Sequence, residues 1–136
     1  MLSNSGSLVP HIIIEHSALP LNMEALNREV HAAAMAMEAL PAGGLRVRNH
    51  PVDVARTGDG REGAGFIYIT VRLGRGRSEA VRRQIGEEIM AVLSAFTREH
   101  FAQHPLSLGV EVEEIAGLTF KQNNIHDLLR QEGEET

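Results

Sequence analysis

The residue with the clearest chemical potential is Pro10, which opens the apolar run VPHIIIEH over residues 9–16. At the start of a chain, a proline is a secondary amine whose nitrogen can act as a catalytic base. Inside a chain, the same nitrogen belongs to a resonance-stabilised amide. An internal proline in this place simply begins a strand, because the first residue of a strand need not donate to the ladder. Pro10 is therefore a candidate base only where the chain begins with it.

Val9 offers a route to such a chain. A valine codon of the GTG type can serve as a bacterial start, which is read as methionine and then removed before a proline. We therefore expect residues 1–9 to be an N-terminal extension outside the domain, absent from the working protein. The alternative is that the extension is retained, which leaves Pro10 without a basic lone pair.

The composition excludes several other kinds of chemistry. The 136 residues, 43% of them hydrophobic, suit one domain with its own core. The chain has no cysteine, which excludes disulfides, thiolate nucleophiles and cysteine-based metal sites. The net charge of −5 argues against a nucleic-acid partner. No apolar run reaches the roughly 18 residues of a membrane span, and residues 1–8 do not resemble a secretory signal. We expect a cytoplasmic protein with no membrane partner, no metal and no cofactor.

The first half of the chain has the pattern of a βαβ unit. The run over residues 9–16 predicts a strand. Asn22 is a good helix N-cap, and apolar residues then recur at spacings of three and four up to Met37, which predicts a helix that stops near Pro41. Residues 45–48 alternate apolar and basic side chains, as a half-buried strand does.

The second half repeats this order after a glycine-rich loop over residues 56–65. Residues 66–71 are β-branched or aromatic and predict a strand. Ser78 is the N-cap of a second predicted helix, whose apolar stripe runs from Val81 to Phe96 and which ends before Pro105. Residues 108–113 resume the alternation of a strand.

Together these elements predict an α+β fold, in which two βαβ units form one four-stranded sheet. Right-handed crossovers place both helices on one face of the sheet. We expect the other face to carry apolar side chains and to be covered in a homo-oligomer. The domain is predicted over residues 10–129, and the acidic tail over residues 130–136 is expected to be disordered.

Four segments of the sequence resemble one known family: PHIIIE at 10–15, GLRVR at 44–48, GRGRS at 74–78 and FKQNNIH at 120–126. In this order and spacing they are similar to the 5-carboxymethyl-2-hydroxymuconate delta-isomerases of the tautomerase superfamily. The last segment is distinctive for this branch. The resemblance implies a tautomerase-like fold and a trimeric assembly of chains, each with two βαβ units.

The resemblance also implies an activity. Members of the family are cofactor-independent isomerases that move a proton on an unsaturated 2-hydroxy polycarboxylate, in the degradation of the aromatic compound homoprotocatechuate. Their base is the N-terminal proline, which corresponds to Pro10. This chemistry needs an amine whose pKa lies near the working pH, and apolar surroundings and nearby cations both lower an ammonium pKa.

The resemblance implies two substrate-binding arginines. Arg77 corresponds to an arginine that binds a substrate carboxylate. Arg46 corresponds to one that binds the 2-oxo or carboxylate end and stabilises a dienolate. Arg48 and Arg75 are weaker candidates. The planar guanidinium suits bidentate carboxylate binding. Without the resemblance, an arginine in such a turn is most simply solvated. We expect residues 121–124 to hold the C-terminal segment in place rather than to bind substrate.

Two alternatives remain open on the sequence alone. A retained extension would make the chain a non-catalytic trimeric relative that binds an acidic small molecule. An active enzyme could also use another enol, such as a 2-hydroxydienoate or a phenylpyruvate-like compound, because the shape of the pocket cannot be read from one sequence.

Overall fold

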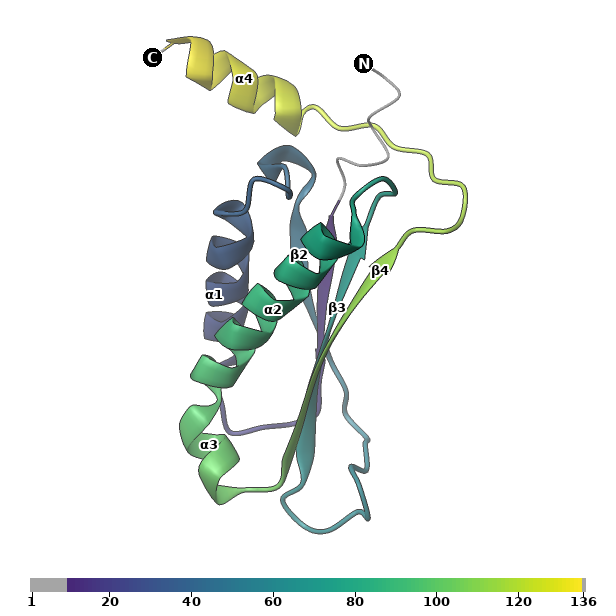
Figure 1. Ribbon diagram of the computed structural model, residues 1–136. Coiled ribbons are helices and arrows are strands. Elements are labelled where there is room, and N and C mark those ends of the chain that lie inside the picture. The colour runs from purple at the N-terminus through teal and green to yellow at the C-terminus, as the bar shows by residue number, and fades with distance from the viewer. Residues whose placement is uncertain (1–9, 136) are drawn as a thin grey trace.

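The computed structural model describes residues 10–135 and contains one four-stranded sheet with its helices (Figure 1). In chain order, the elements are β1 (His11–His16), α1 (Met23–Met35), the 3-10 helix η2 (Ala42–Gly44), β2 (Arg46–Pro51), β3 (Gly65–Leu73), α2 (Glu79–Phe96), α3 (Arg98–Gln103), β4 (Leu106–Glu114) and α4 (Ile125–Glu135).

The sheet confirms the two predicted βαβ units. Its strand order is β2-β1-β3-β4, with β1 parallel to β2, β3 parallel to β4, and the central pair β1 and β3 antiparallel. Helices α1 and α2 lie on the same face of the sheet (Figure 1). Because the central strands are antiparallel, the start of β1, the start of β2 and the end of β3 meet at one end of the sheet.

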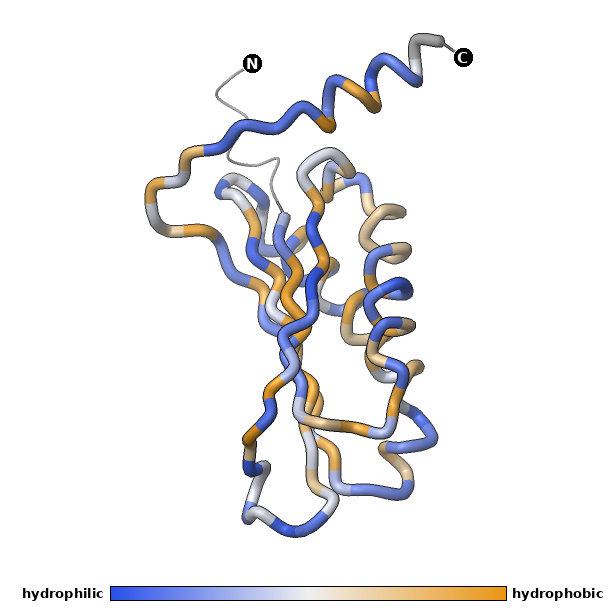
Figure 2. Tube along the Cα trace, turned by 180° about the vertical axis from the view of Figure 1, so that it is seen from behind, coloured by the Kyte–Doolittle hydropathy of each residue, from blue (hydrophilic) through white to orange (hydrophobic). Residues whose placement is uncertain are grey.

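The core lies between this sheet and the two long helices. Alternate residues of β1 and β3 point into it, among them Ile12, Ile14 and Ile69, each with none of its surface exposed. From the helices, Leu26 of α1 and Ile89 of α2 are equally buried. Figure 2 shows the resulting alternation of apolar and polar residues along the strands. The core fixes the register of the strands, because a slip of one residue would turn each buried side chain outward.

Both predicted helix starts are confirmed by their capping hydrogen bonds. The side chain of Asn22 accepts from the Ala25 amide at 3.1 Å, and that of Ser78 accepts from the Val81 amide at 3.2 Å. The end of the first helix differs from the prediction, because α1 stops at Met35, before the predicted end near Pro41. α2 stops at Phe96, the last residue of its predicted apolar stripe, and the short α3 follows before Pro105.

The prediction of an apolar uncovered face is wrong for most of that face. The strand register and the alternation of burial place these residues on the face away from the helices: His11, Ile13, Glu15, Arg46, Arg48, His50, Phe66, Tyr68, Thr70, Arg72, Ser107, Gly109, Glu111 and Glu113. Only Ile13 and Phe66 of this set carry purely hydrocarbon side chains. The face is instead divided by charge, with arginines toward β2 and glutamates on β4.

The predicted disorder of residues 130–136 also differs from the structure. Helix α4 continues to Glu135, while Thr136, like residues 1–9, lies outside the described residues. An ion pair between Arg130 and Asp127, at 2.9 Å, links adjacent turns of this helix. Composition predicted disorder because it does not take into account an ion pair between adjacent turns, which stabilises a helix.

Within residues 10–135, no helix combines the length and the apolar character that a crossing of a bilayer requires.

Candidate active site

Pro10 lies at the end of the sheet where β1 and β2 both begin. It is buried, and its carbonyl accepts a hydrogen bond from the Arg46 amide at 3.1 Å. The next residue, His11, is the register partner of Arg46 on one side and of Arg72 on the other. The sheet therefore places a basic residue on each side of His11, namely Arg46 on β2 and Arg72 on β3.

His11 and two arginines form a contact cluster on the uncovered face. The Nη1 atom of Arg48 lies 3.1 Å from Nδ1 of His11, and the Nη1 atom of Arg46 lies 3.5 Å from Nε2 of the same ring. Arg46 also donates to the Gly44 carbonyl at 3.5 Å. The predicted residues Pro10, Arg46 and Arg48 are thus brought together, with His11 between the two arginines.

The electrostatic surroundings of His11 are cationic. Burial first, and then the charges of Arg46, Arg48, Arg72 and Lys121, lower the pKa of His11 below its usual range. Each cause disfavours the imidazolium form. Near neutral pH His11 is therefore a neutral ring, which donates through one nitrogen and accepts through the other.

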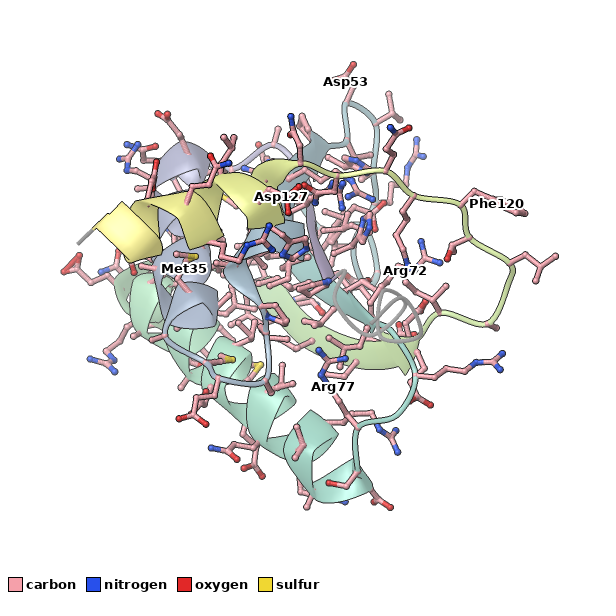
Figure 3. The ribbon with its side chains drawn as sticks, turned by 90° about the horizontal axis from the view of Figure 1, so that it is seen from above. Met35, Asp53, Arg72, Arg77, Phe120 and Asp127 are labelled. Carbon is pink, nitrogen blue, oxygen red and sulfur yellow. The ribbon has the colours of Figure 1, made fainter. Side chains whose placement is uncertain are left out.

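Arg77 is positioned by backbone carbonyls of two separate segments. Its Nε and Nη2 atoms donate to the Ala39 carbonyl at 3.0 and 2.6 Å, and Nη1 donates to the Gly74 carbonyl at 3.2 Å. Burial lowers the pKa of Arg77, while Glu114 raises it, and the group stays charged. Figure 3 looks down on this end of the sheet and shows Arg77 in the connection that follows Arg72 and β3.

The segment after β4 docks on the connection that precedes β2. Asn123 donates through Nδ2 to the Gly43 carbonyl at 2.8 Å, and its Oδ1 accepts from the Ile125 amide at 2.6 Å. A Cβ atom at Gly43 would lie 2.1 Å from Nδ1 of His126, so only glycine allows α4 to approach so closely. Of residues 121–124, Asn123 makes the hydrogen bond that holds the C-terminal segment against Gly43.

This docking also forms one wall of a pocket beside the arginine cluster. The pocket has a volume of about 320 Å³ and is lined by Arg46, Gln122, Asn123, Asn124 and Ile125. Its guanidinium and amide groups suit the oxygen atoms of a carboxylate. The asparagines can thus have a second role as lining residues, which sequence patterns alone did not favour.

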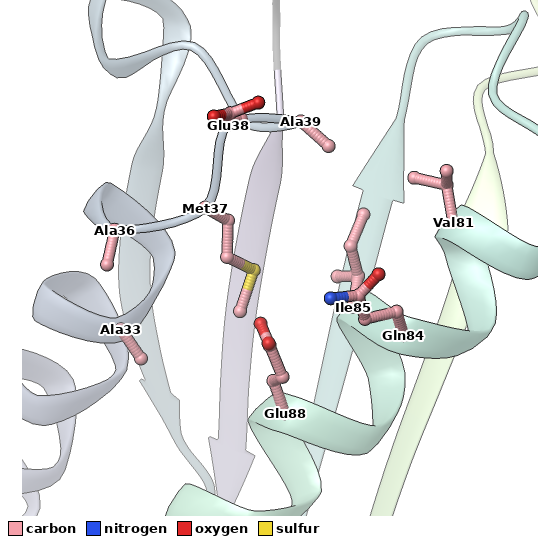
Figure 4. Close-up of a pocket in the computed structure, with 9 residues that line it drawn as sticks. All are labelled: Ala33, Ala36, Met37, Glu38, Ala39, Val81, Gln84, Ile85 and Glu88. Atoms are coloured by element: carbon pink, nitrogen blue, oxygen red, sulfur yellow. The ribbon is translucent and has the colours of Figure 1, made fainter.

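A larger hollow of about 560 Å³ lies between α1 and α2 on the helical layer (Figure 4). Apolar side chains such as Met37 and Ile85 line it together with the carboxylates of Glu38 and Glu88. Negative charge there disfavours an anionic substrate, and none of the candidate residues lines it. The arginine cluster is therefore the better candidate site despite its smaller pocket.

Sequence reasoning missed His11, which belongs to the cluster, and Arg72, which lies beside His11 on β3. Their placement depends on pairing between strands that are far apart in the chain, which alternation within one strand does not reveal. Arg72 pairs with Glu113 across β3 and β4, with 3.4 Å between Nε and Oε1. Within residues 10–135, no three His, Asp or Glu side chains are grouped to hold a metal ion.

Comparison with known proteins gives the family. The model of the 5-carboxymethyl-2-hydroxymuconate isomerase family matches residues 10–129. The 5-carboxymethyl-2-hydroxymuconate Delta-isomerase of Escherichia coli is 31% identical over an alignment of 126 residues, and the match covers 90% of this chain and 100% of that protein.

Two solved structures agree with this match. A crystal structure of a 5-carboxymethyl-2-hydroxymuconate delta-isomerase has a TM-score of 0.82 and 30% identity, and covers 90% of this chain and 94% of its own. The 5-carboxymethyl-2-hydroxymuconate isomerase from Deinococcus radiodurans R1 has a TM-score of 0.86 and 29% identity, with 91% and 96% covered. The predicted fold and the prediction of an isomerase are confirmed. The chain belongs to the 5-carboxymethyl-2-hydroxymuconate isomerase family.

Proposed function

We propose that this protein isomerises an unsaturated 2-hydroxy polycarboxylate of the 5-carboxymethyl-2-hydroxymuconate type, with the nitrogen of an N-terminal Pro10 as the base. The reaction would belong to homoprotocatechuate degradation and take place in the cytoplasm. The observation that carries the proposal is the position of Pro10, which is buried directly beside the cluster of Arg46, Arg48 and His11.

The proposed reaction is a proton shift along a conjugated system. The neutral amine of Pro10 accepts the proton of the 2-hydroxyl group, and the resulting ammonium returns a proton to a carbon further along the diene. The neighbouring arginines disfavour the ammonium form, so the proton is readily passed on. General base catalysis of this kind contributes roughly 10²–10⁴-fold to a rate.

The arginines stabilise the negative charge that develops during this shift. Arg46 is assigned to the 2-oxo or carboxylate end, where it stabilises the dienolate. Arg77 is assigned to a second carboxylate, with its guanidinium held in one orientation by the Ala39 and Gly74 carbonyls. A preorganised cation needs little rearrangement when the charge develops.

The proposal is tested by turnover of two substrates on a chain that begins at Pro10. Loss of the ultraviolet absorbance of the conjugated enol is followed for 5-carboxymethyl-2-hydroxymuconate and for the enol of phenylpyruvate. We expect the polycarboxylate to have the higher kcat/KM, because it engages more cations. Faster turnover of the phenylpyruvate enol would overturn the substrate class, and polycarboxylate binding with no turnover would identify a non-catalytic relative.

We also propose that the protein works as a homotrimer. The edge strands β2 and β4 expose backbone groups without a partner strand among the described residues, and such edges favour pairing with another chain. Contact of β2 in one copy with β4 in the next is head-to-tail, and a head-to-tail contact can close into a ring. Arg48 on β2 and Glu111 on β4 supply opposite charges to the two edges.

Sedimentation velocity at micromolar concentration checks this assembly. We expect one species with three times the mass of the chain. A stable monomer would contradict the trimer.

A further inference from the structure

The ring of His11 faces an arginine on each of its two nitrogens. Arg48 Nη1 is 3.1 Å from Nδ1, within hydrogen-bond range, while Arg46 Nη1 is 3.5 Å from Nε2, at the limit of that range. A guanidinium can only donate. A neutral imidazole has a single accepting nitrogen, so it can accept from only one of the two arginines.

The distances decide which nitrogen carries the proton. If Nδ1 carried it, two donors would face each other at 3.1 Å, which is unfavourable. If Nε2 carries it, Nδ1 accepts from Arg48, and the two groups that face each other at 3.5 Å are Nε2–H and a donor of Arg46. The shorter contact therefore places the proton on Nε2, beside Arg46.

We infer that His11 and Arg46 form a two-donor cradle for one carboxylate or enolate oxygen of the substrate, with Arg48 as the positioning residue that sets the tautomer of His11. Nε2 of His11 and Nη1 of Arg46 lie 3.5 Å apart. One anionic oxygen can therefore lie 2.7–2.9 Å from both nitrogens, which is the usual distance of a charge-assisted hydrogen bond. The inference deepens the proposed function and rests on it for the identity of the substrate.

In the cradle, His11 contributes a directed N–H group rather than a positive charge, because its ring is neutral. Among residues 10–135, the charges that act on the ring are those of Arg46 and Arg48 on β2, Arg72 on β3, and Lys121 in the segment after β4, and all of them are cations. An added imidazolium charge would be repelled by each of them. A neutral ring instead contributes an aimed N–H to a site whose positive charge the arginines already supply.

The first test is the tautomer itself, read from the long-range ¹H–¹⁵N spectrum of the full chain at pH 7.5. We expect the His11 signals of an unprotonated Nδ1 and a protonated Nε2, assigned by their loss in His11→Gln. At pH 6.5, where an ordinary histidine is about half charged, His11 is expected to be less protonated than an ordinary histidine, because its pKa is lowered by burial and the neighbouring cations. A ring with Nδ1–H, or an imidazolium at pH 7.5, would overturn the inference.

The role of Arg48 is tested by Arg48→Ala in the same spectrum. Loss of the hydrogen bond to Nδ1 is expected to give a mixture of both tautomers. An unchanged tautomer in this variant would show that Arg48 does not position the ring.

The cradle is tested by titration with cis,cis-muconate, a conjugated dicarboxylate that lacks the reacting hydroxyl group. We expect His11→Ala to weaken binding about ten-fold, which is the loss expected for one hydrogen bond to a charged group. His11→Gln retains an N–H donor and is expected to recover part of this loss. The matched control is His31→Ala, at an exposed position of α1, which is expected to bind like the unchanged chain.

Failure of this inference can be distinguished from failure of the proposed function. Equal muconate affinity in His11→Ala and the unchanged chain would overturn the cradle even if the enzyme isomerises its substrate. Conversely, the expected tautomer and the ten-fold weaker binding would establish the cradle in a protein that shows no turnover.

Discussion

A chain that begins at Pro10 is expected to isomerise 5-carboxymethyl-2-hydroxymuconate roughly 10²–10⁴-fold faster than the 136-residue chain, which is the range of general base catalysis. The reason is the nitrogen of Pro10. In the longer chain it is part of a peptide bond, and its lone pair is delocalised into the carbonyl of Val9. Only removal of residues 1–9 creates a basic amine at this position.

A chain that begins at Val9 is the matched control for this comparison. It differs by one residue and also has a free terminal amine, but its Pro10 nitrogen is an amide. We expect it to be as slow as the full chain. Equal and appreciable activity of the full chain and the chain beginning at Pro10, measured by loss of the enol absorbance, would contradict the proline mechanism.

Replacement of Arg46 by alanine is expected to lower kcat/KM by roughly 10²–10⁴-fold, because two hydrogen bonds to an anionic substrate would be lost, each contributing about 1.5–3 kcal/mol. A lysine at this position keeps the charge but not the planar fork, so Arg46→Lys is expected to recover only part of the rate. Steady-state kinetics on chains that begin at Pro10 give both values.

The fold should tolerate this change. The Arg46 side chain is exposed, and its two contacts, with His11 and Gly44, both have the long distance of 3.5 Å. The melting temperature of Arg46→Ala is therefore expected to stay close to that of the unchanged chain. The matched control is Arg83→Ala on α2, where the exposed arginine pairs with Glu79 at 3.0 Å. An Arg46→Ala variant with the kinetics of this control would rule out a role in substrate binding.

Much of the fold could be predicted from local patterns. The caps Asn22 and Ser78 and the apolar runs of β1 and β3 are short-range signals, and the structure confirms each of them. Recognition of two βαβ units accounts for the parallel pairs β1–β2 and β3–β4, whereas the antiparallel pairing of β1 with β3 that joins the units comes from the structure. The end of α1 was harder to predict, because Met37 continues the apolar spacing of the helix although the helix has already stopped at Met35.

The uncovered face shows where local patterns fail. Its character depends on which residues of four strands share that face, and the outward positions of β2 and β4 carry arginines and glutamates rather than apolar side chains. The same limit applies to the candidate site. Pro10, Arg46 and Arg48 could be singled out from the sequence, whereas the place of His11 between the arginines requires the register of β1 against β2.

The surroundings of Arg77 could not be predicted from its residue type and its place in the sequence. Its place in a turn before a helix is compatible with a solvated side chain. In the structure the guanidinium is half-buried and held by the Ala39 carbonyl, which comes from the first half of the chain. That contact links the two βαβ units, and no short-range pattern predicts it.

The central claim is that the nitrogen of Pro10 is the base, and the intact mass of the protein isolated from the cells that make it tests this claim most directly. We predict the mass of a chain that begins at Pro10, with residues 1–9 absent. The mass of a chain that begins at Met1 would contradict the claim, because the Pro10 nitrogen would then be an amide in the working protein.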